Sequence, residues 1–400
     1  MKRTLQFGII LALAAGAAWS QEKTAPLTRQ GNAWVEETNG VLTGATRLKV
    51  SSPEGGIEIR GGSQPEIAYK VRKRIRVPRE QEARRLLNEC PIKARISGDL
   101  AELILDCPAQ RGRRQRVGAD FYVTVPKTLA RAMLETMGGG VLVDNIDGEV
   151  SARTAGGGIS MDHIGGAVTL ETAGGGIKLG QVHGRIKAQT AGGQIDLESA
   201  GDEAVLTTSG GNIIVVQCTK ALRAETAGGE IRIQRAGGNI VAGTAGGDVR
   251  IGDAAGTVIA QTSGGSIHVD SAHGLVRAET AGGGIRLWKI AGPVRAETAA
   301  GNITAQVVAT GKLWGDSILE TTVGDVVVYL PVDLAVTIRA TIEAAGSRHN
   351  IISDFPMSIR SSRDQPGVRE VSGESQMNGG GAPLRIRTTS GNIEIRKVKQ

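Results

Sequence analysis

Thr154-Ala155-Gly156-Gly157-Gly158-Ile159 recurs along this 400-residue chain at a constant interval. The pattern returns with small variations every eighteen residues, and no insertion or deletion separates its ten copies. Its threonines are Thr136, Thr154, Thr172, Thr190, Thr208, Thr226, Thr244, Thr262, Thr280 and Thr298. A constant period of this kind is typical of repeat proteins, in which each unit stacks on the next.

Apolar and polar residues alternate on both sides of each glycine run. The positions five and seven residues after the threonine are apolar, as in Ile231 and Ile233, and a polar residue such as Arg232 stands between them. An apolar residue such as Leu222 stands four residues before the threonine, and the position two before it is mostly alanine, as in Ala224. Alternation with a period of two indicates a half-buried β-strand. Each unit therefore predicts two short strands with a turn after each.

Glycine pairs follow the threonine in almost every unit. We expect a turn there, because glycine adopts a positive φ angle without the steric cost that a Cβ atom brings. The predicted turn glycines are Gly156, Gly157, Gly174, Gly175, Gly192, Gly193, Gly210, Gly211, Gly228, Gly229, Gly246, Gly247, Gly264, Gly265, Gly282 and Gly283. A second turn is expected on the other side of each coil, at pairs such as Gly165-Gly166.

These patterns predict an all-β protein, a two-sheet β-solenoid with 18-residue coils, capped by small β-rich N- and C-terminal segments. The composition agrees, because 58 glycines suit a chain of tight turns and 40% hydrophobic residues are too many for a disordered chain. A β-sandwich made of hairpins is the alternative. Hairpins, however, would not require every unit to keep one length and one inward pattern.

The chain is expected to have four parts. They are a signal peptide at 1–20, an N-terminal β-rich capping module at 21–130, the solenoid of ten repeats at 131–310, and a C-terminal β-rich cap with a final coil at 311–400. Lys2 and Arg3 precede an apolar run that ends in small residues, which is typical of a signal peptide and predicts export to the periplasm, the cell surface or the medium. Within the N-terminal module, Arg79–Asn88 predicts a short helix, and Leu384 begins the final coil.

With these segments in place, the chain resembles the bacterial "putative adhesin" family of β-strand-repeat proteins over about residues 41–398. The resemblance rests on Val50–Arg60, Tyr122-Val123-Thr124-Val125-Pro126, the Thr-Ala-Gly-Gly-x-Ile coils, Tyr329-Leu330-Pro331 and Thr389-Ser390-Gly391-Asn392-Ile393. It implies an exported β-solenoid and no known catalytic residues. The uniformity of the central repeats departs from the family and leaves room for a lineage-specific role.

Metal binding is expected neither at the turns nor at the histidines. A calcium-binding glycine roll carries an aspartate in nearly every turn, whereas Asp248 is an isolated acid here. His183 and His273 share a column but lie five coils apart. The remaining histidines, for which the sequence predicts no matching ligands, are His163, His268 and His349. The sequence shows no cofactor motif.

Asp144 and Asp162 are the candidates for catalysis, because they occupy the same outward column on adjacent coils, with Asp147 nearby. Stacked carboxylates would lie close to the separation of about 5 Å that retaining glycosidases use. A carbohydrate-active enzyme on a β-helix is therefore an alternative function. Solvated surface acids are the simpler interpretation, since no cleft-forming insertion or aromatic platform accompanies the pair.

Two basic runs could bind anionic glycans, lipopolysaccharide or lipid headgroups, in line with the net charge of +7. They consist of Lys70, Arg72, Lys73, Arg74 and Arg76, and of Arg111, Arg113, Arg114 and Arg116. Nucleic acid is not expected, because proteins that bind it usually interleave aromatic residues for stacking. The alternative is that these charges are solvated and protect strand edges.

The cysteines and two tryptophans leave further alternatives open. Cys90 and Cys107 fall in one N-terminal region, where export permits a disulfide but the sequence does not decide it. Cys218 falls in a column of alanines and is expected to be a small interior residue rather than a reactive thiol. Trp288 and Trp314 either mark a binding patch or cover an irregular corner of the core.

The predicted function is that of a non-enzymatic, exported structural or binding protein, adhesin-like, which presents a rigid repetitive surface. Its partner is left open among an envelope polymer, another protein and self-association, and peripheral contact with an anionic membrane surface is a further option. The alternatives are the carbohydrate-active enzyme and an envelope-stress accessory protein that binds anionic envelope components.

Overall fold

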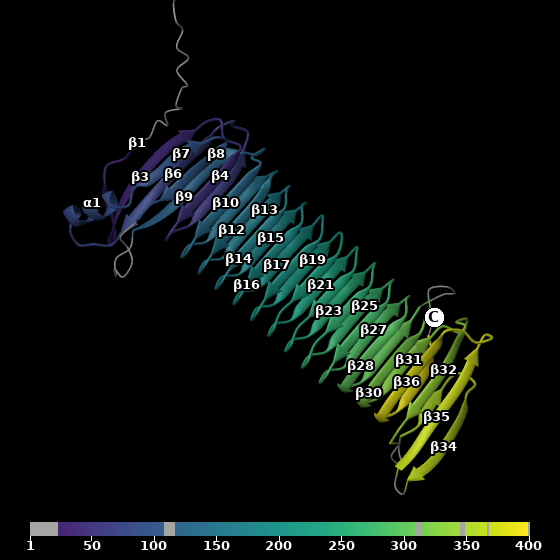
Figure 1. Ribbon diagram of the computed structural model, residues 1–400. Helices are drawn as coiled ribbons and strands as arrows, with labels where there is room; N and C mark the ends of the chain where they lie inside the picture. The colour runs from purple at the N-terminus through teal and green to yellow at the C-terminus, as the bar shows by residue number, and fades with distance from the viewer. Residues whose placement is uncertain (1–22, 108–116, 309–313, 345–348, 366–367, 399–400) are drawn as a thin grey trace, which may run out of the picture.

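The protein is a long rod built from two β-sheets, with one short helix at its N-terminal end (Figure 1). The computed structural model describes residues 23–107, 117–308, 314–344, 349–365 and 368–398, so the predicted signal peptide at 1–20 lies outside the described residues. Within these ranges, sheet A has 19 strands and sheet B has 18. Among the described residues, no helix combines the length and the apolar character that a membrane span requires.

One coil consists of β12 (Glu149–Thr154), the glycine turn, β13 (Ile159–Ile164) and a second turn that leads to β14 (Val168–Thr172). Even-numbered strands belong to sheet B and odd-numbered strands to sheet A throughout the central repeats. Neighbouring strands in each sheet are parallel and pair residues eighteen positions apart, such as Ile159 with Ile177. Hairpins would make antiparallel neighbours. The two-sheet solenoid is therefore confirmed, and the β-sandwich is excluded.

The other central strands are four to seven residues long. In sheet B they are β10 (Arg131–Thr136), β16 (Ile186–Thr190), β18 (Ala204–Thr208), β20 (Leu222–Glu225), β22 (Ile240–Gly243), β24 (Val258–Gln261), β26 (Val276–Thr280) and β28 (Val294–Ala300). In sheet A they are β11 (Val141–Ile146), β15 (Ile177–Val182), β17 (Ile195–Ala200), β19 (Ile213–Cys218), β21 (Ile231–Ala236), β23 (Val249–Ala254), β25 (Ile267–Ala272), β27 (Ile285–Ile290) and β29 (Ile303–Val307).

The columns that the alternation marks as inward fill the space between the sheets. Ile231 and Ile233 of sheet A are buried, and so are Leu222 and Ala224 of sheet B. These columns form one hydrophobic cluster that extends from the N-terminal module to the last coil. Each buried aliphatic side chain contributes about 1.5 to 3 kcal/mol relative to an exposed one, so the core stabilises the whole length of the rod.

The turn glycines are required for a different reason from the one predicted. None of the predicted turn glycines has a positive φ angle. Instead, the second glycine of each pair lies against the backbone of the preceding coil, and a Cβ atom on Gly211 would lie 2.0 Å from the carbonyl oxygen of Gly193. The first glycine has room, since a Cβ atom on Gly210 would lie 3.6 Å from its nearest neighbour, and Ala300 occupies this position in the last repeat. Glycine here permits close backbone approach.

The repeat threonine joins each coil to the coil before it. The Thr208 hydroxyl donates to the carbonyl oxygen of Gly193 (2.8 Å) and accepts the N–H of Gly211 in its own turn (3.3 Å). The same two bonds recur at every repeat threonine from Thr154 to Thr280. These threonines are only 2% to 8% exposed. Each hydroxyl therefore satisfies two backbone groups where water has little access.

At the N-terminal end, the order of the coils in the stack differs from their order in the chain. The elements of this end are β1 (Lys23–Thr24), β2 (Thr28–Gln30), β3 (Ala33–Leu42), β4 (Arg47–Ser52), β5 (Ile57–Gly62), β6 (Ile67–Ile75), α1 (Glu80–Asn88), β7 (Ile92–Ser97), β8 (Leu100–Leu105) and β9 (Gly118–Pro126). The coil of β4 and β5 stacks on β10 and β11, and β8 and β9 stack on its other side. Beyond them, β6 and β3 extend sheet A with antiparallel pairing, and β7 extends sheet B.

The helix and the N-terminal cysteines lie beside each other in this module. Helix α1 begins one residue later than the predicted helix and ends at the same residue. Cys90 follows it and forms a disulfide with Cys107, with the two Cα atoms 4.4 Å apart. The bond ties the helix to the segment that leaves β8.

The C-terminal coil is last in the chain but not last in the stack. The elements of this end are β30 (Ser317–Val323), β31 (Val326–Leu330), β32 (Val336–Ile342), β33 (Ile351–Ser353), β34 (Ser358–Gln365), β35 (Val368–Met377), β36 (Pro383–Ser390) and β37 (Ile393–Lys397). Strand β36 pairs in parallel with both β30 and β32, and β37 pairs with both β31 and β33. The hairpin of β34 and β35 then ends sheet B (Figure 1).

Candidate functional site

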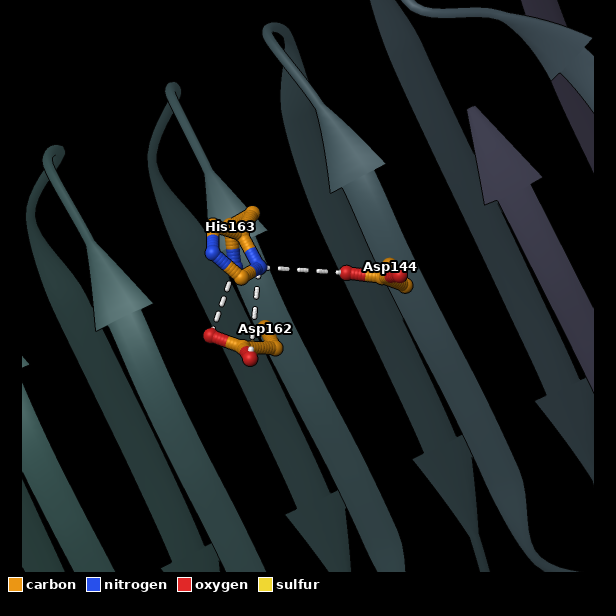
Figure 2. Close-up of side chains that lie close together, drawn as sticks. All are labelled: Asp144, Asp162 and His163. Atoms are coloured by element: carbon orange, nitrogen blue, oxygen red, sulfur yellow. Dashed lines mark hydrogen bonds and ion pairs between the residues drawn. The ribbon is translucent and has the colours of Figure 1, made fainter. Parts of the chain in front are cut away.

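Two aspartates and a histidine meet on the outer face of sheet A, toward the N-terminal end of the rod (Figure 2). Asp144 on β11 and Asp162 on β13 are direct neighbours in the register that the sequence predicts. His163 Nδ1 lies 3.3 Å from Oδ1 of Asp144 and 3.2 Å from Oδ2 of Asp162. One ligand atom from each of the three residues lies within 4.8 Å of the other two.

The local backbone conformation and an adjacent glycine allow these three side chains to meet. His163 has a φ angle of 52°, and Asn145, at the same position one coil earlier, has a φ angle of 61°. Asparagine and histidine enter this left-handed region more readily than most residues. Gly180 leaves space in the next coil, because a Cβ atom there would lie 2.1 Å from Oδ1 of Asp162. This oxygen accepts the N–H groups of His163 and Gln181, both at 2.9 Å.

The prediction that His163 has no matching ligands nearby is wrong, because the left-handed backbone turns its ring toward the two carboxylates. The group offers two carboxylate oxygens and one imidazole nitrogen, which are ligand atoms that divalent transition metals bind. Among the described residues it is the one cluster of this composition. The side chains of Asp144, Asp162 and His163 are 48%, 48% and 56% exposed, so water reaches the same atoms.

The other polar residues considered from the sequence do not join this group. Asp147 faces Lys127, with 3.6 Å between Oδ1 and Nζ. His268 contacts Oδ1 of Asp270 at 2.7 Å on β25, far along the rod. The remaining histidines lie on other coils or beyond the central repeats, namely His183, His273 and His349.

The first basic run lies on β6, and acids on the neighbouring strands neutralise most of it. The ion pairs are Lys70 with Glu37 (2.9 Å), Arg72 with Glu37 (3.8 Å), Lys73 with Glu36 (2.5 Å) and Arg74 with Asp120 (2.9 Å). Lys73 is buried and therefore unavailable to an anionic ligand, whereas Arg76 is exposed. An edge-protecting role is also wrong for this run, because β6 lies between β3 and β9. The second run, Arg111, Arg113, Arg114 and Arg116, lies outside the described residues.

We expect Lys73→Met to weaken the N-terminal module. The change leaves the Glu36 carboxylate, 18% exposed, and the carbonyl oxygen of Leu87 without the ammonium group that contacts both. Because the remaining charge is partly buried, the free energy of unfolding should fall by about 2 kcal/mol, measured by urea denaturation. Lys70→Met removes an exposed pair and should cost only about 0.5 kcal/mol. An equal effect of the two changes would contradict a structural role for Lys73.

Cys218 and Trp314 are interior residues, and Trp288 lies on the surface. Cys218 is buried at the end of β19, and burial raises the pKa of its thiol. Reactive cysteines need the thiolate form, so this thiol suits packing rather than chemistry. Trp314 belongs to the core, whereas the Trp288 ring lies 6.1 Å from the Tyr329 ring on the outer face of sheet A. The two tryptophans therefore do not form one exposed patch.

Solved structures of known proteins include chains that resemble this one. No family model and no curated protein matches the chain. A putative adhesin from Bacteroides fragilis NCTC 9343 is 14% identical with a TM-score of 0.30, over 60% of this chain and 95% of that one. A putative cell adhesion protein from Clostridium sporogenes ATCC 15579 is 10% identical with a TM-score of 0.20, over 95% of this chain and 100% of that one. Both names agree with the family that the sequence resembles. Sequence identities and TM-scores this low support no conclusion about activity.

Proposed function

We propose that this chain is an exported, adhesin-like binding protein without catalytic activity, which presents a rigid repetitive surface to a partner. The observation that carries the proposal is the constant period of the ten repeats, whose strands keep one parallel register up to a shift between β27 and β29. That register places equivalent outward side chains one strand spacing (~4.8 Å) apart along the rod. A partner that repeats on a similar scale meets many equivalent weak contacts, and such contacts combine through multivalency. An envelope polymer, a surface protein built from repeats and a second copy of the chain would have this property.

Ion pairs between coils support a surface of defined geometry. Arg131 pairs with Glu149 (2.5 Å) and Arg153 with Glu171 (2.7 Å), each joining one strand of sheet B to the next. Exposed pairs of this kind stabilise a protein by less than about 1 kcal/mol each. Their contribution is to hold long side chains in fixed rows, which favours recognition of an extended partner over catalysis.

A carbohydrate-active enzyme is the second candidate function. It is favoured by the Asp144–Asp162 pair, whose ligand atoms lie within 4.8 Å of each other. Retaining glycosidases hold two carboxyl groups about 5 Å apart, on opposite sides of the scissile bond. Here His163 contacts both carboxylates, and all three groups lie on the outer face of a sheet. An envelope-stress accessory that binds anions through the β6 run has less support, since most of that run is ion-paired.

The test is binding of residues 21–400 to an array of bacterial and host glycans, peptidoglycan and anionic lipids, with released product measured on the same spots. We expect binding without turnover, and we expect Asp144→Asn combined with Asp162→Asn to leave that binding unchanged. Turnover of any polymer that this double variant abolishes would replace the proposal with the enzyme. Salt-sensitive binding to anionic lipid that is lost with Arg76→Gln would instead favour the accessory protein.

A further inference from the structure

A groove of 630 Å³ crosses the outer face of sheet A beside the glycine turns. It extends along the rod from β9 across β5, β11, β13 and β15 to β17. Its lining includes Gly140, Gly158 and Gly176, each four residues after a repeat threonine. Tyr122 and Leu142, each 40% exposed, also line it. A linear molecule lying in this groove would cross the strands and follow the axis of the rod.

The lining of the groove includes a row of unpaired backbone donors. The N–H groups of Gly140, Gly158, Gly176 and Gln194 have no hydrogen-bond acceptor among the described residues. All four residues are exposed. Because they occupy one column of the solenoid, consecutive donors are about 4.8 Å apart.

At five other positions of the same column, the chain supplies the acceptor itself. Asn212 Oδ1 accepts the N–H of Glu230 in the next coil at 2.9 Å. The equivalent bonds run to Asp120 from Gly56 (3.0 Å), to Asp248 from Ser266 (2.8 Å), to Asn302 from Asp325 (2.9 Å) and to Asp325 from Asn392 (2.7 Å). Asparagine and aspartate oxygens thus cap the donor of the following coil in this column. In the groove, glycine leaves the position of that oxygen open to a ligand.

One basic side chain of the groove, Lys178, is available to an acidic ligand. Two of the groove's three acids are neutralised by arginine, Glu58 by Arg60 (2.7 Å) and Asp120 by Arg74 (2.9 Å). The third, Asp196, keeps its charge and accepts a hydrogen bond from the side-chain amide of Gln194 (2.6 Å). Lys178 lines the groove and has no acidic partner among the residues that the structure describes. Carboxylates also accept hydrogen bonds from N–H groups more strongly than neutral oxygens do.

We propose that this groove binds a linear polysaccharide that carries carboxylates, laid along the rod. Its carboxylate oxygens would accept the N–H groups of Gly140, Gly158, Gly176 and Gln194, as aspartate and asparagine oxygens do in other coils. The donors follow one another at one strand spacing (~4.8 Å), which is on the order of the length of one sugar residue, so a linear chain laid along the rod can reach more than one donor with its carboxylates. The proposal rests on the proposed binding function and names the ligand class of one surface.

The test uses substituted side chains of the protein itself as acceptors for two of these N–H groups. Gly158→Asn combined with Gly176→Asn gives two coils the oxygen that Asn212 supplies to Glu230, and it fills the groove. The chain without its signal peptide is titrated calorimetrically with oligogalacturonate, and with the same oligomer after methyl esterification. We expect the unmodified chain to bind the acidic oligomer and to bind the methyl ester about tenfold more weakly. The double variant should also lose about tenfold in affinity for the acidic oligomer.

Gly284→Asn is the matched control, because it makes the same change in the same column outside this groove. The Cβ atom would lie 3.2 Å from a carbonyl oxygen of the next coil at Gly284 and at Gly158 alike. This control should bind like the unmodified chain, and circular dichroism checks that both variants keep their β-structure. The inference is overturned if the double variant keeps its affinity, if the control loses as much, or if the ester binds equally well. The proposed function fails separately, if the chain binds nothing on the wider array or cleaves what it binds.

Discussion

A single methyl group at Gly211 should lower the free energy of unfolding by at least about 3 kcal/mol. The Cβ atom of Gly211→Ala would lie 2.0 Å from the oxygen and 2.4 Å from the carbon of the Gly193 carbonyl, and 2.7 Å from the nitrogen of Gln194. All three atoms belong to the backbone of a coil that is stacked on both sides, so the clash cannot be relieved by rotating a side chain. Urea denaturation followed by circular dichroism measures the loss.

Gly210→Ala is the matched control for this prediction. Its Cβ atom would lie 3.6 Å from the carbonyl oxygen of Gly192, an ordinary van der Waals contact, and Ala300 already stands at the equivalent position. The change should therefore alter stability by only about 0.5 kcal/mol. If both alanines cost the same, the glycines would act through backbone flexibility rather than through close approach of neighbouring coils.

The sequence predicts the sheets well and the role of the glycines poorly. Alternation around Ile231 and Ala224 identifies which side chains face inward, because a strand has a period of two wherever it occurs. The requirement for Gly211 depends on how closely it approaches Gly193, eighteen residues earlier. That distance follows from the path of the coil and not from local propensity. The sequence did carry a signal, since the second glycine of the pair is retained in every repeat while Ala300 replaces the first.

The candidate site could likewise be predicted only in part. The neighbouring positions of Asp144 and Asp162 follow from the period alone, and the structure confirms them. His163 was missed because its ring reaches the carboxylates only through a positive φ angle, which the repeat does not predict. The tendency of histidine and asparagine to adopt such angles was the available signal, given that Asn145 and His163 share one column.

The order of the coils at the two ends could not be predicted from the repeat. Leu384–Ile395 has the pattern of a coil, but its pattern does not say which coils it lies between. In the structure β36 lies between β30 and β32, so the chain passes this position and returns to it. The β4–β5 coil is enclosed similarly between β8–β9 and β10–β11. The last strands pair antiparallel in both sheets at the N-terminal end and in sheet B at the C-terminal end, which ends the parallel stack there and limits its further growth. In sheet A at the C-terminal end, the last described strand, β33, pairs in parallel with β37.

Removing one hydroxyl group from the interior should lower the free energy of unfolding by about 2 to 3 kcal/mol. Thr208→Val keeps the size and branching of the side chain but removes the donor to the Gly193 carbonyl and the acceptor of the Gly211 N–H. Both backbone groups then lack a partner at a position where Thr208 is 3% exposed, so water replaces the hydroxyl poorly. Urea denaturation measures the stability, and hydrogen exchange of the Gly211 amide reports the local effect.

Thr207→Val is the control, because it makes the identical change one residue earlier, on the outer face of β18. Val205 already stands on that face, and no hydrogen bond of the Thr207 side chain is found among the described residues. The control should alter stability by only about 0.5 kcal/mol, and Thr208→Ser, which keeps the hydroxyl, should lose less than Thr208→Val. Equal losses for the two valine variants would mean that the threonine column is retained for its shape. A specific loss at Thr208 would mean that the Gly193 carbonyl, which also excludes a side chain at Gly211, holds neighbouring coils together through the threonine.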